Sequence, residues 1–133
     1  MGSGSGIVWS TDGYIVTASH VIGKRSTVRV GLGNGKSHEA KILGRDPYTY
    51  IALLQVEAKE LKPIKLGDSQ DLRPGQFVLA LANPFGRQVS ATQGIVTGVH
   101  GEIRTLGGIT IEDTIITDTR LNPGYSGGPL INV

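Results

Sequence analysis

The stretch "IVWSTDGYIVTASHVI", residues 7–22, decides the fold class of this chain. Ile7 to Trp9 and Tyr14 to Thr17 are two short apolar runs, and Thr11-Asp12-Gly13 between them is typical of a tight turn. Runs of this length joined by such a turn predict a pair of β-strands. His20 closes the second run, where a polar side chain needs a structural or a chemical reason.

The rest of the chain repeats this pattern of short apolar runs between glycine and proline turns. Val28 to Leu32 and Ala40 to Leu43 are expected to pair across Asn34-Gly35, because this dipeptide tolerates the positive φ angles of a tight hairpin. Glu57 to Leu61 is expected to form one helical turn before Pro63. The other expected strands are Ile51 to Val56, whose continuous apolar run predicts burial on both faces, Gln76 to Leu81, Gln93 to His100, Ile109 to Thr117 and Gly128 to Val133.

This succession of strands with hardly any helix predicts an all-β sandwich or a pair of β-barrels. The turn-rich, charged stretch "KLGDSQDLRPG", residues 65–75, is expected to separate two lobes. We place the first lobe at residues 1–63 and the second at residues 64–133.

Composition narrows the class of protein. The chain has 133 residues, of which 38% are hydrophobic and 18% charged, a balance typical of a globular domain. The net charge is +2 and the basic residues are scattered, which argues against a nucleic-acid or membrane surface. With no cysteine and no paired histidines, we expect neither a metal nor another cofactor. No segment has the length of a membrane span or the pattern of a signal peptide.

Ser126 lies in "NPGYSGGPL", residues 122–130. The surrounding glycines allow sharp turns that leave backbone N–H groups free, as an oxyanion hole requires. Gly124 and Ser126 are the candidate donors. A serine in a glycine-rich loop is often only a turn residue. Here, however, the motif around Ser126 is longer than a bare Gly-x-Ser-Gly, and an apolar strand follows Pro129, so a nucleophile is favoured.

A nucleophilic serine needs a base, and His20 is the candidate. Taken alone, a histidine at the end of an apolar strand is more often a packed or capping residue. However, His20 is the only histidine that ends a strand in this way, whereas His38 and His100 are expected at the surface.

Together, "TASHVI" around His20 and "NPGYSGGPL" around Ser126 resemble the trypsin-like serine proteases, most closely their HtrA/Deg branch. The resemblance extends through "GRDPYTYIALLQV", "LGDSQDLRPGQFVLALANPFG" and "QGIVTGV", which is nearly the whole chain. It implies two Greek-key β-barrel lobes with a cleft between them. It also implies that Ser126 attacks a peptide bond, that His20 takes and returns the proton, and that the backbone of Gly124 and Ser126 holds the oxyanion. Leu121 matches a pocket residue that suits small or medium aliphatic side chains.

The sequence departs from this family at the third catalytic position. The family places an aspartate directly before the apolar strand, where this chain has Tyr50. Asp46 lies four residues earlier and is expected to have a structural role in the loop, and Glu57 is at the far end of the strand. Tyr50 is neutral near pH 7, so it cannot stabilise the imidazolium of His20 as a carboxylate does.

The resemblance also implies further strands before "GSGSGIV" and after "GGPLINV", so we expect both lobes to be incomplete at the termini. The expected function is a serine endopeptidase core that acts on unfolded or misfolded proteins with severely reduced activity. The alternative is an inactive pseudoprotease that binds extended peptides in the cleft or on strand edges. Relatives of this kind commonly form homo-oligomers and work outside the cytoplasm, and the sequence alone leaves both points open for this chain.

Overall fold

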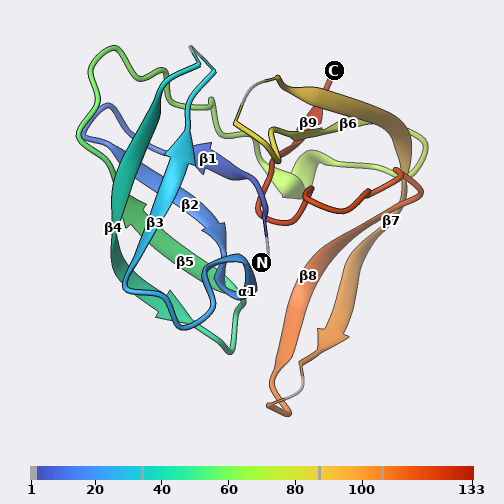
Figure 1. Cartoon of the computed structure of the whole chain (residues 1–133). Helices are drawn as coiled ribbons and strands as arrows, with labels where there is room; N and C mark the ends of the chain where they lie inside the picture. The colour runs from blue at the N-terminus through green and yellow to red at the C-terminus, as the bar shows by residue number, and fades with distance from the viewer. Residues whose placement is uncertain (1–2, 34, 87, 106) are drawn as a thin grey trace.

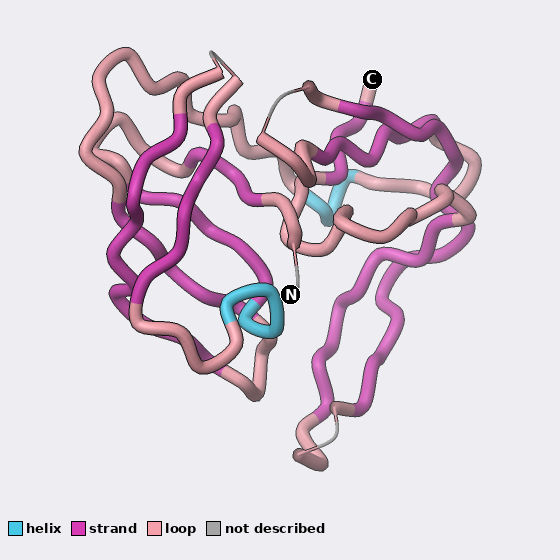
Figure 2. The backbone as a smooth tube through the Cα atoms, in the orientation of Figure 1, coloured by secondary structure: helices cyan, strands magenta, loops and turns pink. Residues whose placement is uncertain are grey.

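The computed structural model describes residues 3–133 except Asn34, Arg87 and Leu106. These residues form almost only β-strands (Figure 2), with a four-residue helix, α1 (Ser19–Ile22), and a short 3-10 helix, η1 (Ser69–Asp71). The strands make two curled antiparallel sheets that lie beside each other (Figure 1). The predicted all-β, two-lobed fold class is confirmed.

The first sheet has the strand order β1-β2-β5-β4-β3. Its antiparallel pair of β2 and β5 aligns Ile15 with Leu54 and Ala18 with Ile51. One face of this sheet closes over a core of small and aliphatic side chains, and a side chain from α1 completes that core. The strands are β1 (Gly6–Val8), β2 (Tyr14–Ala18), β3 (Thr27–Gly31), β4 (Ser37–Asp46) and β5 (Ile51–Gln55), and the core consists of Ile15, Ile22, Ala40, Ala52, Leu54 and Val56.

The second sheet has the strand order β8-β7-β6-β9. Its strands are β6 (Phe77–Ala82), β7 (Ser90–Arg104), β8 (Thr110–Thr117) and β9 (Leu130–Asn132). The long β7–β8 hairpin bends away from the rest of the sheet and runs down beside the first one (Figure 1). The pairing of β7 with β8 shifts register around His100 and Asp113, and both residues have positive φ. Such bulges bend a hairpin, and here the two residues also form an exposed hydrogen bond of 2.8 Å.

Two of the contacts between the sheets lie at points distant from their cores. At the tip of the hairpin, a Cβ added to Gly107 would lie 3.4 Å from the ring of Tyr48, which belongs to the β4–β5 loop. At the opposite end, Gly31 of β3 lies against Gly86 so closely that a Cβ on Gly31 would be 2.5 Å from the Gly86 Cα. At the second contact the two backbones approach each other so closely that Gly31 must be a glycine, whereas a Cβ on Gly107 would lie at an ordinary van der Waals distance from the Tyr48 ring.

Several sequence expectations need correction. Glu57 to Leu61 forms no helical turn, because Glu60 has φ 61° and because Ala58 and Leu61 pack along the first core in an irregular segment. The expected strand Ile51 to Val56 is buried on one face only, and Ile51 is 52% exposed. The β3–β4 hairpin forms as expected, although Asn34 lies outside the described residues. The lobe boundary at residues 63 and 64 stays a prediction.

Candidate active site

Ser126 lies in the second of two consecutive tight turns. The Tyr125 N–H donates to the Asn122 carbonyl at 3.1 Å, and the Gly128 N–H donates to the Tyr125 carbonyl at 3.0 Å. Gly124 and Gly127 each occupy the third position of a turn, with φ of 91° and 88°. Positive φ at that position is typical of type II turns, which require glycine there. The Ser126 side chain is exposed as a result.

The two turns leave donors unused inside the loop. In the part of the chain that the structure describes, neither the Gly124 N–H nor the Ser126 N–H donates an intramolecular hydrogen bond. The N–H between them, that of Tyr125, is consumed by the first turn. This alternation leaves one N–H on each side of Tyr125 without an intramolecular partner within the described part of the chain, as the predicted oxyanion hole requires.

The packing around the loop excludes side chains at both turn glycines. A Cβ on Gly124 would collide with Pro84 of the β6–β7 loop. A Cβ on Gly127 would collide with the Ser5 carbonyl oxygen and the Thr17 hydroxyl. The loop is therefore seated against three separate segments of the chain, and its shape is fixed by them as well as by its own turns.

His20 is positioned by the end of β2. That strand stops at Ala18, and α1 begins at the next residue. The Ser19 N–H donates to the Tyr50 carbonyl at 2.8 Å, so the start of α1 is tied to the residue that precedes β5. Ile22, two residues after His20, is buried in the first core, whereas His20 is exposed. The short helix thus turns the imidazole away from the core.

Ser5 connects the segment of His20 to the loop of Ser126. The Thr17 hydroxyl donates to the Ser5 carbonyl at 2.6 Å, and the Ser5 N–H donates to the Ser126 carbonyl at 2.9 Å. Figure 1 shows this N-terminal segment running between the two sheets beside the red loop that leads to β9. Two hydrogen bonds through one residue therefore hold the end of β2 and the serine loop together.

Tyr50 lies next to the backbone of α1 in an unusual conformation. Its φ is 64°, a left-handed value that is uncommon for an aromatic residue. Within the described residues, no hydrogen bond joins the side chains of His20, Tyr50 and Ser126. The structure thus brings the backbones of the three predicted positions to one region, and the third position carries no carboxylate.

Asp46 supports the loop that contains Tyr50. Its carboxylate accepts hydrogen bonds from the Thr49 hydroxyl at 2.9 Å and from the Tyr48 N–H at 3.0 Å. The Thr49 hydroxyl and then the Tyr48 N–H hold the pKa of Asp46 below its usual value. Asp46 therefore has the structural role expected of it, since both of its oxygens are used inside the loop.

The remaining predicted residues lie around this region. Leu121, the expected pocket residue, is 64% exposed before the first turn. Asp118 accepts a hydrogen bond from the Ile95 N–H at 2.8 Å and fixes the approach to the serine loop. His100 is exposed, as expected, whereas His38 is half-buried.

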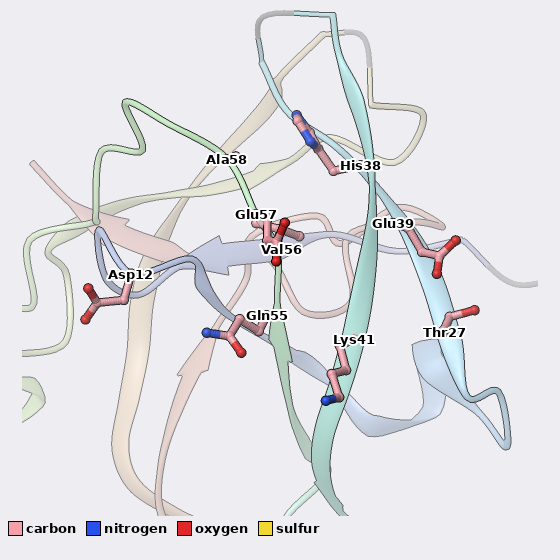
Figure 3. Close-up of a pocket in the computed structure, with 9 residues that line it drawn as sticks. All are labelled: Asp12, Thr27, His38, Glu39, Lys41, Gln55, Val56, Glu57 and Ala58. Atoms are coloured by element: carbon pink, nitrogen blue, oxygen red, sulfur yellow. The ribbon is translucent and has the colours of Figure 1, made fainter.

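A shallow polar depression of about 590 Å³ lies elsewhere, on the first sheet. Figure 3 shows its carboxylates spread around the rim, with Asp12 and Glu39 on opposite sides. It contains neither His20 nor Ser126, and its lining residues are Asp12, Thr27, His38, Glu39, Lys41, Gln55, Val56, Glu57 and Ala58. Among the described residues, no three histidine, aspartate or glutamate side chains gather as metal ligands would. None of the helices in those residues has the length and apolar character needed to cross a bilayer.

Sequence reasoning missed Ser5 and Thr17. The segment "GSGSG", residues 2–6, has no feature in its composition that indicates four hydrogen bonds at Ser5. One available signal was the alternation of glycine with serine, because glycine permits the close approach seen here at Gly4 and Gly6.

Comparison with known proteins identifies the family to which this sequence is similar. A family model of the trypsin-like peptidase domain matches residues 4–133. The probable periplasmic serine endoprotease DegP-like of Pseudomonas putida (strain GB-1) is 45% identical over 98% of this chain, which spans 27% of that relative. Protease Do-like 1, chloroplastic, of Arabidopsis thaliana is 44% identical over 98% of this chain, which spans 30% of it.

Solved structures agree with these relatives. The HtrA-type protease AlgW with a decapeptide superimposes with a TM-score of 0.86 at 38% identity, over 97% of this chain and 39% of that one. Deg5 superimposes with a TM-score of 0.84 at 40% identity, over 98% of this chain and 69% of that one.

Proposed function

The chain belongs to the family of trypsin-like peptidase domains, and on that premise we propose that it is the core of a serine endopeptidase with severely reduced activity. The observation that carries this proposal is the double turn at Ser126, which exposes the Ser126 hydroxyl and leaves the N–H groups of Gly124 and Ser126 without intramolecular partners among the described residues. Ser5 ties this loop to the strand that ends before His20. The proposed substrates are peptide bonds of unfolded or misfolded proteins.

In the proposed reaction, the Ser126 hydroxyl oxygen attacks the carbonyl carbon of the scissile bond while His20 accepts its proton. The Gly124 and Ser126 N–H groups bind the oxyanion that forms. His20 then gives the proton to the departing amine, and water hydrolyses the acyl-enzyme by the same steps. Leu121 is proposed to contribute to the pocket for the substrate side chain.

The proposed weakness lies at Tyr50. In serine proteases, replacing the triad carboxylate by an amide lowers turnover by about 10⁴-fold. This corresponds to roughly 5 kcal/mol of transition-state stabilisation. The left-handed backbone at Tyr50 supports the same view, because aspartate and asparagine adopt this conformation more readily than tyrosine does.

The test is hydrolysis of labelled casein by the chain and by its Tyr50→Asp variant, each beside a Ser126→Ala blank. We expect Tyr50→Asp to raise kcat/KM by about 10²- to 10⁴-fold, since it restores a charge that stabilises the imidazolium. Tyr48→Asp is the matched control, because it makes the same change in the same exposed loop away from α1. Activity of the unchanged chain equal to that of Tyr50→Asp would contradict the proposal.

A second candidate is a peptide-binding module without catalysis. It is supported by β8, an edge strand of eight residues whose outer backbone groups have no paired strand among the described residues. Extended peptides bind to edges of this kind. Saturable binding of a peptide without acylation of Ser126, in both the chain and Tyr50→Asp, would favour the module over the enzyme.

The wider setting is also a proposal. The relatives named above are called periplasmic or chloroplastic, which supports a location outside the cytoplasm for this chain. Assembly into a homo-oligomer stays a prediction from the sequence.

A further inference from the structure

Ser5 uses every polar atom it has, and its side chain has a separate role from its backbone. The Ser5 hydroxyl donates to the Gly124 carbonyl at 2.8 Å and accepts from the Asn83 N–H at 2.9 Å. The residue is 9% exposed, so water cannot easily replace either bond. A single hydroxyl therefore joins the serine loop to the start of the β6–β7 loop.

A hydrogen bond to the Gly124 carbonyl affects the orientation of the peptide groups on both sides of this glycine. Gly124 has φ 91° and no side chain, so its flanking peptide groups rotate more freely than those of any other residue type. Its carbonyl belongs to the peptide group that continues to Tyr125, and its N–H is one of the two unused donors. Fixing the carbonyl direction limits rotation about Gly124, which in turn limits the direction of the adjacent N–H.

The bond to Asn83 links this restraint to a second contact on the same glycine. Pro84, the next residue, lies where a Gly124 Cβ would be. The Ser5 hydroxyl thus holds Gly124 directly through its carbonyl and indirectly through the loop that packs on it. Both bonds depend on one oxygen atom, so losing that atom releases the glycine from two sides.

We propose that the Ser5 side chain is a positioning residue that sets the Gly124 peptide of the oxyanion-binding loop. The inference rests on the proposed peptidase function, because it concerns the donors that would hold the oxyanion. A misplacement of about 1 Å at such a site costs on the order of 10²-fold in rate. Loss of the hydroxyl should therefore reduce the reaction of Ser126 without any change at His20.

The test uses the Tyr50→Asp background and measures the second-order rate of phosphonylation of Ser126 by a fluorophosphonate. We expect Ser5→Ala to lower this rate by about 10- to 100-fold, on the same scale as one misplaced donor. Ser5→Thr, which keeps the hydroxyl, should recover most of the rate. Ser3→Ala is the matched control, because Ser3 is exposed and lies two residues away.

The pH profile separates positioning from general loosening. The pH midpoint of phosphonylation should be the same in Ser5→Ala as in its parent, because the proposed change lies at Gly124 and leaves the proposed base in place. An unchanged rate in Ser5→Ala overturns the proposal. So does a loss that Ser5→Thr fails to recover, or a loss accompanied by a shift of that midpoint. If Ser5→Ala does not fold, Ser5→Cys is measured instead. We expect an intermediate loss of the phosphonylation rate, because a thiol is a weaker donor than a hydroxyl.

A second readout does not depend on activity. The Tyr125 N–H belongs to the same peptide group as the Gly124 carbonyl, so its ¹⁵N chemical shift reports the hydrogen bond from Ser5. Ser5→Ala should move this shift and speed hydrogen exchange at Asn83, while Ser3→Ala should change neither. If Tyr50→Asp fails to react with the fluorophosphonate at all, the proposed function is wrong, and this readout alone decides the role of Ser5. Unchanged Tyr125 and Asn83 signals would then overturn that role.

Discussion

Replacing Gly127 with alanine would add one carbon at the most crowded point of the serine loop. The new Cβ would collide with the Ser5 carbonyl oxygen and the Thr17 hydroxyl, and it would lie 3.0 Å from the Ala18 nitrogen. These neighbours belong to the strand that leads to His20 and to the segment that bridges it to Ser126. The substitution therefore strains the backbone and forces two segments apart.

The two costs can be estimated separately. A left-handed backbone costs a residue with a Cβ about 1–2 kcal/mol. Overpacking by a carbon costs a further 1–3 kcal/mol or so. We therefore expect Gly127→Ala to lower the free energy of unfolding by about 2–5 kcal/mol. Gly75→Ala is the matched control, because Gly75 has φ 95° but nothing within 4 Å of its added Cβ. It should lose only the backbone part, about 1–2 kcal/mol.

The assay is urea unfolding of both variants and the parent, followed by circular dichroism and by the fluorescence of Trp9. Equal m-values would show that the free energies can be compared directly. The difference between the two variants then measures the collision alone. Losses that agree within about 0.5 kcal/mol, the usual size of an unremarkable surface effect, would refute the packing described for Gly127.

Three further predictions concern other parts of the chain. The pKa of Asp46 is lowered in the fold, so its hydrogen bonds stabilise the protein fully above its ordinary pKa of about 3.9. This contribution disappears as the pH falls through the lowered folded value. The difference in free energy of unfolding between the parent and Asp46→Asn, measured by urea unfolding, should therefore be constant near neutral pH and shrink in acid. Val96 is fully buried, so Val96→Ala should lower the free energy of unfolding by about 2 kcal/mol. Val133 is 93% exposed, so Val133→Ala should change that free energy by no more than about 0.5 kcal/mol. Equal melting temperatures of the two variants would contradict this prediction. Thr17→Val should cost about 1–3 kcal/mol, since it leaves the Ser5 carbonyl unpaired, and a calorimetric scan that detects no loss would argue against that bond.

Much of the fold was predictable because its signals are local. The turn at Asp12-Gly13 and the apolar runs around it specify a strand pair, and β1 and β2 lie where they were expected. The segment Glu57 to Leu61 was not predictable in this way. Its residues favour a helix, but packing of Ala58 and Leu61 on the first core overrides that preference. The one-turn helix at His20 was also missed, since four residues are too few to give a periodic signal.

In the candidate site, too, local features were predictable and long-range contacts were not. The glycines around Ser126 indicate sharp turns, and the two positive φ angles at Gly124 and Gly127 agree with that reasoning. Ser5 was not predictable, because its partners are distant in sequence and its own neighbours are only glycines. The left-handed conformation of Tyr50 was equally hidden, since tyrosine favours an extended backbone.

The bond from Ser5 to Gly124 spans 119 positions of the chain. Closing a loop of that length costs roughly 4 kcal/mol of chain entropy, and long-range contacts of this kind form slowly. The serine loop therefore reaches its final position only when Ser5 and Gly124 have both been synthesised and have met. Until then Ser126 sits in an untethered glycine-rich loop. In a nascent or half-folded chain the proposed oxyanion-binding loop would not yet be held in place, so the order of folding sets the time at which the proposed site is assembled.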